Sequence, residues 1–260
     1  MNANFEFASE FASDYELSVC TFGDLSEAVG GNELSIEAIK ILGTNEFAIP
    51  FNGYASALTL TFNVCKIRDC EIIPLSAEEY SKINRWLNRQ EPHKFRTSTD
   101  SFERIFYIGT FNVTPVFING LIYGAELTFT SIYPYGFQDE IVNEFSNVTD
   151  FDVICFSDEI GDTYPYVIIT CNEPGDLTIT NSLDNEIFVL NNVVAEEVIT
   201  IDNKHKIITS SEDTHEIYSN FNFNFLKLCN TYKDRRNVYN STLDINITFK
   251  YNPIRKVGIY

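Results

Sequence analysis

Apolar and polar residues alternate along most of this 260-residue chain, in short runs separated by turn residues. Two clear runs are residues 58–64 and 221–225, in which every second residue is apolar. A period of two is typical of a strand with one buried face and one face in water. Similar runs occupy residues 102–113, 176–182, 185–194, 196–211 and 242–251. The pattern therefore predicts a mostly β protein.

Two tight turns predict β-hairpins within this pattern. Asn119-Gly120 lies between apolar pairs, and both residues tolerate the positive φ that a type I′ turn requires. Residues 202–205 separate two other runs in the same way. The strand after the first hairpin stops at residues 133–136, Tyr-Pro-Tyr-Gly, where the proline removes a backbone donor. We interpret this stop as a domain end, which gives two domains, residues 1–136 and 137–260.

Residues 76–90 break the strand pattern and predict one α-helix. Ser76 and Glu79 have the spacing of a capping box, in which each side chain binds the backbone N–H of the other residue. An apolar stripe at helical spacing follows, formed by Tyr80, Ile83, Trp86 and Leu87. Pro92 prevents the helix from continuing. We expect this stripe, which carries the single Trp of the chain, to cover one face of the first sheet.

Residues 24–57 follow neither period. Gly30-Gly31-Asn32 interrupts the chain, and the hydrophobic residues after it have no regular spacing of two or of 3.6. One interpretation is an extended arm that packs on something other than its own sheet. The other is an ordinary edge strand with a loop, and the pattern alone does not separate the two.

The charge of the chain argues against a nucleic-acid or lipid-binding surface. It has 18 Lys and Arg against 37 Asp and Glu, a net charge of −19, and both halves are acidic. Specific grip on phosphates needs basic side chains. The first 20 residues hold no Lys or Arg and no continuous apolar segment, and no run approaches about 18 apolar residues. We therefore expect neither a secretory signal nor a transmembrane helix, and no membrane partner.

The six cysteines are scattered without CxxC spacing: Cys20, Cys65, Cys70, Cys155, Cys171 and Cys229. Without an export signal they are expected to be reduced and buried, as small core side chains.

The sequence shows no motif for catalysis, metal binding or a cofactor. His93, His205 and His215 lie far from one another and from cysteines, and are expected at solvated surface positions. The acidic loop 157–162 lacks the length and spacing of an EF-hand, which favours a solvated turn over a cation site. Neither a GxSxG elbow nor a phosphate-binding glycine loop occurs. We predict no catalytic residue, no metal ligand and no cofactor.

The order of the features resembles a known family. The chain runs from DYELSVCTFGD through the irregular stretch to LTLTFNVCK, a capped helix ending in WLNRQEPHKF, the Asn-Gly hairpin and IYPYGF. Its second half contains GDLTITNSLDNEIFVLNNVVAEEVITIDNKHKIITS and closes with FKYNPIRKVGIY. This succession is similar to that of the distal tail proteins of long-tailed bacteriophages, over nearly the whole chain. Residues 24–57 and 140–166 match least.

The resemblance implies a fold and a role. The first domain would be a β-sandwich with one helix that forms a hexameric ring, and the second a galectin-like β-sandwich. The arm would clasp the neighbouring subunit, and the ring would join the tail tube to the baseplate or receptor-binding apparatus. Its expected partners are the tail tube protein, a tail-associated hub protein and a receptor-binding protein. The candidate interface residues of the arm are Leu34, Ile36, Ile39, Ile41, Phe47 and Ile49.

The same resemblance implies a location at the virion tail tip after synthesis in the host cytoplasm. DNA would pass through an acidic ring without specific binding. Two alternatives remain: a carbohydrate-binding module, or a tail-associated glycan-degrading enzyme. Sugar sites use aromatic platforms, for which the second half, which lacks Trp, offers tyrosines: Tyr164, Tyr166, Tyr218 and Tyr232. The enzyme alternative has no recognisable active-site residues.

Overall fold

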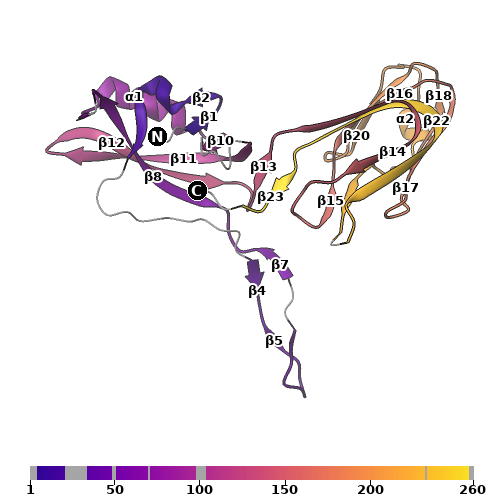
Figure 1. Ribbon diagram of the computed structural model, residues 1–260, viewed down its shortest axis with the longest axis horizontal. Helices are drawn as coiled ribbons and strands as arrows, with labels where there is room; N and C mark the ends of the chain where they lie inside the picture. The colour runs from indigo at the N-terminus through magenta and orange to yellow at the C-terminus, as the bar shows by residue number, and fades with distance from the viewer. Residues whose placement is uncertain are drawn as a thin grey trace. The chain divides into compact units, whose positions relative to one another are not determined.

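The computed structural model describes residues 5–20, 34–48, 51–69, 71–97, 104–231 and 233–257. The chain divides into two compact units, residues 1–138 with 255–260 and residues 139–254 (Figure 1). We call them unit 1 and unit 2 and describe each by itself. Strands dominate both units, which confirms the mostly β class.

A ten-stranded sheet forms the body of unit 1. Its main path is β2-β1-β10-β11-β12-β8-β3, and β9, β13 and β23 pair at its margins. The strands span Phe5–Phe7 (β1), Glu10–Phe11 (β2), Leu17–Cys20 (β3), Thr59–Arg68 (β8), Glu71–Ile73 (β9), His93–Thr97 (β10), Ile105–Ile118 (β11), Leu121–Ser131 (β12), Gly136–Gln138 (β13) and Ile254–Arg255 (β23). A 3-10 turn at Ala12–Tyr15 (η1) connects β2 to β3.

The hairpin of β11 and β12 is as predicted. Ile118 pairs with Leu121 across the turn, and Asn119 and Gly120 have φ values of 51° and 82°. On β12, Leu127 and Phe129 are fully buried, whereas their polar neighbours lie on the other face. The alternation in the sequence therefore gives the correct register of this strand.

The predicted helix is also confirmed, as α1 (Ala77–Leu87). The Ser76 Oγ accepts from the Glu79 N–H at 3.2 Å, and Glu79 Oε2 accepts from the Ser76 N–H at 2.8 Å, which completes the capping box. Trp86 is 1% exposed, stacks on Phe5 at 5.6 Å between ring centroids, and donates from Nε1 to the Phe7 carbonyl at 2.9 Å. The helix thus closes over β1 and the aromatic core of unit 1.

Unit 2 is built on a seven-stranded sheet that surrounds its own core. The sheet runs β18-β17-β22-β16-β19-β20, with β14 paired to β22. Its strands span Ile141–Ile154 (β14), Tyr166–Cys171 (β16), Gly175–Asn181 (β17), Ile187–Val193 (β18), Val198–Asp202 (β19), Ile207–Ser210 (β20) and Arg236–Tyr251 (β22). Gly161–Thr163 (β15) pairs with Leu228–Asn230 (β21), and Ile217–Asn220 (α2) is one helical turn. The second predicted hairpin is confirmed as β19 and β20.

The predicted strand at residues 221–225 is wrong. Phe221 forms only an isolated bridge to Leu190, and Phe223 has a φ of 59°, which is incompatible with a strand. The Asn222 side chain here replaces the backbone hydrogen bonds that a paired strand would form with β18. Its Oδ1 accepts from the Val189 N–H at 3.2 Å, and its Nδ2 donates to the Ile187 carbonyl at 2.8 Å.

The cysteines within the described ranges are free thiols. Four are buried as predicted, and Cys20 is half-buried: the buried four are Cys65, Cys155, Cys171 and Cys229. Cys70 lies outside the described residues. Burial raises the pKa of the Cys171 thiol to about 12, with a further contribution from the Glu197 charge, so this thiol stays protonated and inert.

Candidate functional site

The arm predicted from the sequence is a two-part hairpin in the structure. Leu34–Ile36 (β4) pairs with Phe51–Tyr54 (β7), and Ile39–Lys40 (β5) pairs with Phe47–Ala48 (β6) (Figure 1). Each pair is a two-stranded sheet of its own, separate from the ten-stranded sheet. Gly43, with φ of 82°, turns the chain at the tip, where the Ile41 N–H donates to the Glu46 carbonyl at 3.0 Å. The arm is therefore neither an edge strand of the body nor an irregular loop.

The predicted interface residues of the arm are exposed wherever the structure describes their side chains. Leu34 is 44% exposed, Ile39 51%, Ile41 43% and Phe47 57%. Ile36 lies in β4, but its side chain and all of Ile49 are outside what the structure describes. Exposed apolar residues clustered on one short element mark an interaction surface.

Leu42 was missing from the predicted interface, although it is 97% exposed at the tip of the arm. The signal for it was present in the sequence, because Leu42 directly precedes the turn glycine and extends the apolar run of Ile39 and Ile41. A leucine at a glycine turn has no core to enter within its own hairpin.

The base of the arm packs on the Tyr-Pro-Tyr-Gly stop. The Tyr54 ring lies 6.0 Å from that of Tyr135, and the Lys256 ammonium lies 5.8 Å from the Tyr54 ring centre. Tyr135 in turn contacts Phe137 at 5.4 Å. The Tyr-Pro-Tyr-Gly segment thus both ends strand β12 and contacts the base of the arm through Tyr135.

A second exposed apolar surface of unit 1 lies at the turn of the β11–β12 hairpin. Phe117 is 61% exposed, Ile118 43% and Leu121 51%, on either side of Asn119-Gly120. These residues strengthen the hairpin prediction from sequence, but that prediction gave no role to their exposure. They offer a contact surface separate from the arm.

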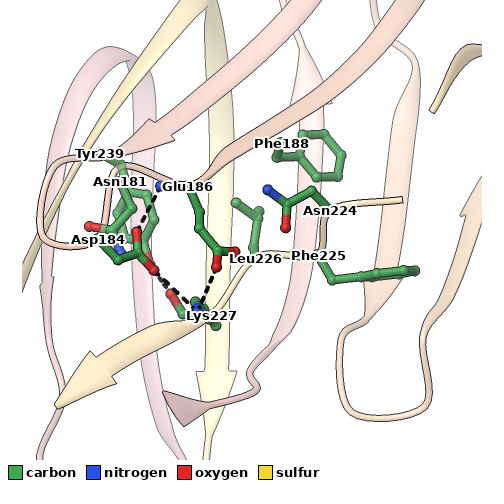
Figure 2. A pocket seen from close by; sticks show the side chains of 9 residues that line it. All are labelled: Asn181, Asp184, Glu186, Phe188, Asn224, Phe225, Leu226, Lys227 and Tyr239. Carbon is green, nitrogen blue, oxygen red and sulfur yellow. Dashed lines mark hydrogen bonds and ion pairs between the residues drawn. The ribbon is translucent and has the colours of Figure 1, made fainter. Parts of the chain in front are cut away.

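In unit 2, Lys227 is the centre of a charged cluster beside a small pocket. Its Nζ lies 2.9 Å from Asp162. It also lies 2.9 Å from Glu186 and 3.4 Å from Asp184 (Figure 2). Burial lowers the pKa of Lys227, but the hydrogen bonds to Asp162 and Glu186 outweigh this and raise it above its usual value. An ammonium thus occupies the position between three carboxylates that a cation would take. The acidic loop 157–162 supplies Asp162 to this cluster rather than to a metal, and no group of metal-ligating residues occurs among the described residues.

His215 corrects the prediction that all three histidines are solvated. Its side chain is 4% exposed and that of Glu197 is fully buried, with His215 Nδ1 2.5 Å from Glu197 Oε1. The other ring nitrogen lies 3.0 Å from the Asn191 carbonyl, and the Ser210 hydroxyl donates to Glu197 at 2.5 Å. Burial raises the pKa of Glu197, but the bonds from Ser210 and His215 outweigh it, so the pKa lies below its usual value.

This buried group does not have the geometry of a catalytic triad. Ser210 donates to the carboxylate of Glu197, whereas a nucleophilic serine is activated by the imidazole. His93 is half-buried with its ring against Phe7, and His205 is exposed beside Asp202 at 2.7 Å. The three histidines therefore have three different environments.

Within the described residues, no helix has both the length and the hydropathy needed to cross a membrane. Of the tyrosines proposed as sugar platforms, Tyr164 lines a pocket, Tyr166 and Tyr218 are exposed elsewhere, and Tyr232 is outside the described residues.

Two family models match the chain, and a solved structure shares its fold. Residues 1–132 match the family model described as a phage tail protein N-terminal domain, and residues 133–251 match that of a phage tail C-terminal domain. The fold is similar to the crystal structure of the Dit (gp 19.1) protein of SPP1, described as a paradigm of the hub adsorption apparatus in Gram-positive infecting phages. The TM-score is 0.69 at 11% identity, over 97% of this chain and 99% of that one. No curated protein sequence matches the chain.

Proposed function

The chain belongs to the phage tail protein family, both of whose domains it contains, and from this premise we propose that it is a structural tail-tip protein. In this proposal six copies form a ring that joins the tail tube to the baseplate or receptor-binding apparatus. The Dit-like fold supports a place at the tail tip, since the similarity covers 97% of this chain and 99% of the solved one.

The observation that carries the ring is the arm. Five large apolar side chains of residues 34–47 are exposed on a hairpin that pairs only with itself among the described residues. Burying that surface on a neighbouring subunit removes the cost of exposing it to water, at about 25 cal/mol per Å². A head-to-tail contact of this kind, repeated around a closed ring, buries the arm of every copy in the same way.

We assign the ring to residues 1–136 and the outward docking of other tail proteins to residues 137–260, which we interpret as a galectin-like domain. The tail tube protein, a hub protein and a receptor-binding protein are its proposed partners, in the virion tail after synthesis in the host cytoplasm. The net charge of −19 suits a ring through which DNA passes without being held.

We further propose that the chain has no catalytic role. The serine, histidine and carboxylate that lie together are wrongly connected for acyl transfer. A glycan-degrading enzyme would instead need a pair of carboxyl groups, one with a raised pKa, and every carboxyl group with a shifted pKa among the described residues is shifted downward. The carbohydrate-binding alternative is supported by one pocket of unit 2, whose lining combines aromatic rings with polar side chains.

The test is the mass of the protein in solution, measured by light scattering over a range of concentrations. We expect a species of six times the 29.7 kDa chain mass. Phe47→Asn, in the arm, should raise the concentration needed for assembly by about tenfold, the effect of losing one aromatic anchor from an interface. The matched control is Phe223→Asn in unit 2, because Phe47 and Phe223 are similarly exposed at 57% and 61%. A wild-type monomer at every concentration, or equal effects of both variants, would contradict the ring.

A further inference from the structure

Unit 2 has an open pocket that the proposed tail role does not use. Its volume is about 410 Å³, within the range of roughly 300–1,000 Å³ that small-molecule sites occupy. Aromatic rings and polar side chains share its lining, which includes Tyr164, Lys206, Phe223, Phe225, Asn224 and Glu186. We call it the aromatic pocket. It adjoins the smaller pocket of Figure 2, with which it shares Glu186, Asn224, Phe225 and Lys227.

Lys206 supplies an uncommitted donor at this pocket. Its ammonium lies 4.2 Å from the centre of the Tyr164 ring and 4.8 Å from that of Phe225. Within the described part of the chain no hydrogen bond or ion pair to a carboxylate is formed by this ammonium, in contrast to Lys227, which is held by three. Burial and the charge of Lys227 lower the pKa of Lys206, against the opposite effect of the Glu186 and Asp162 charges. Because none of these groups forms a described hydrogen bond with the ammonium, its N–H groups are available for a ligand.

Two acceptors complement that donor. The Glu186 carboxylate uses Oε1 to bind Lys227 at 2.9 Å, and its Oε2 has no hydrogen-bond partner among the described residues. The Asn224 Nδ2 donates to the Ile187 carbonyl at 2.9 Å, which fixes the amide and leaves its Oδ1 without a described donor. The aromatic pocket therefore offers donors and acceptors together, with Glu186 held in place by its ion pair with Lys227.

Phe223 is held at this pocket in a strained conformation. Its φ of 59° is left-handed, a conformation that bulky residues rarely adopt, and its ring is nevertheless 61% exposed. The asparagines on either side enforce the strain, because the Asn224 N–H donates to Asn222 Oδ1 at 3.1 Å and both amides bind the Ile187 carbonyl. A strained residue that gains no burial is the kind found at binding sites.

These features fit the two surfaces of a sugar ring. A saccharide has an apolar C–H face that packs on an aromatic ring and a rim of hydroxyl groups that both donate and accept. Phe223 provides the open ring, Lys206 the donor, and Glu186 and Asn224 the acceptors. We propose that the aromatic pocket of unit 2 is a saccharide-binding site. The site lies within one unit, so it does not depend on the ring.

The test is ligand-observed saturation-transfer NMR on the full chain. The probes are N-acetylglucosamine, glucose, galactose and rhamnose, each at up to about 10 mM. We expect saturable binding of at least one sugar, weakened about five- to tenfold by Phe223→Asn. Asparagine tolerates the left-handed backbone, so this variant removes the ring without new strain. Lys206→Gln should weaken the same sugar about tenfold, as the loss of a charged hydrogen bond.

Matched controls come from the same chain. Phe117→Ala removes an equally exposed ring, 61%, from unit 1, and Lys204→Gln removes a lysine two residues from Lys206. Both should leave sugar binding unchanged. Phe47→Asn should also keep sugar binding while it weakens the ring, whereas Phe223→Asn should do the reverse, so failure of one proposal is separable from failure of the other.

Three results would overturn the saccharide site. One is the absence of saturable binding for all four sugars. Another is binding of oligo(glycerol phosphate), which has no sugar ring, with loss on Lys206→Gln but not on Phe223→Asn, since that describes a plain anion site. The third is a wild-type chain that ignores sugars while Phe223→Asn blocks tail assembly, which would assign the surface to a protein partner.

Discussion

His215 and Glu197 form the most enclosed ion pair among the salt bridges of the described residues. The imidazole connects Glu197 to the Asn191 carbonyl of β18, and Ser210 of β20 completes the shell. Three segments of unit 2 are thus joined through one carboxylate. A buried carboxylate that loses a hydrogen-bond partner keeps its full desolvation cost. Removing one partner therefore destabilises the fold by more than the intact pair stabilises it.

We expect His215→Ala to lower the free energy of unfolding of unit 2 by about 2–3 kcal/mol, because Glu197 keeps only Ser210 and the Val194 N–H. His205→Ala should change it by less than about 1 kcal/mol, since the His205 side chain is 63% exposed. The measurement is denaturant unfolding followed by circular dichroism. The fluorescence of Trp86, the single Trp, reports unit 1 alone and should not shift. Equal effects of the two variants would show that the buried pair is not structural.

The pH dependence of this pair follows from Glu197. Its pKa in the folded chain is below the value of about 4.3 of an unfolded glutamate. The stabilisation is therefore fully present above that pH and is lost as the pH falls through the lowered pKa. A smaller acid-induced loss in a Glu197→Gln variant than in the wild type is the expected sign.

No local feature of the sequence distinguishes His215 from the exposed His205. Both lie in polar segments, Asp-Asn-Lys-His and Glu-Asp-Thr-His, and only the fold brings His215 against a glutamate 18 residues earlier. The aromatic pocket could not be predicted from the sequence for the same reason, since its residues come from positions 164, 186, 206, 223–225 and 227. The sequence shows which residue types are available for a site. Which of these residues lie side by side depends on the pairing of strands that are far apart in the chain.

At the scale of elements, short sequence motifs predicted the features that depend only on neighbouring residues, such as helix ends and tight turns. The capping box placed the start of α1, and the Asn-Gly turn fixed the register of β11 and β12. The alternation at residues 221–225 misled, because an asparagine side chain can satisfy strand β18 in place of a backbone ladder. The arm stood out in the sequence because its hydrophobic residues follow no regular spacing. Strands β5 and β6 are only two residues long, which is too short to produce an alternating pattern.

The arm also allows a deletion at this scale. We expect removal of residues 34–54, closed by a Gly-Ser linker, to abolish the hexamer while unit 1 still unfolds cooperatively. The reason is that both arm ladders pair internally and the core of unit 1 is formed by other residues. Light scattering reports the assembly, and Trp86 fluorescence reports unit 1. Loss of the cooperative fluorescence transition would show that the arm belongs to the fold of its own subunit.

At the scale of the whole molecule, several weak features in a fixed order predicted what no single motif could. The succession of arm, capped helix, hairpin and aromatic stop pointed to a fold that is similar to a solved structure with a TM-score of 0.69 at only 11% identity. At that level side chains are replaced while strand order persists, which is why the fold was predictable and the pocket was not. The strong negative charge belongs to this scale too, because it acts between copies and not within one strand or helix.

That charge makes assembly dependent on salt. Each chain carries −19, so six copies in the proposed ring would repel one another, while the arm surface that we propose as their contact is apolar. Raising ionic strength from about 0.01 to 0.15 M shortens the screening length from about 30 to 8 Å, which weakens the repulsion and leaves the apolar contact in place. We expect the hexamer fraction at fixed protein concentration to rise over this range, measured by light scattering. Dissociation on adding salt would instead mean that opposite charges, not the exposed leucine, isoleucine and phenylalanine side chains of the arm, hold the subunits together.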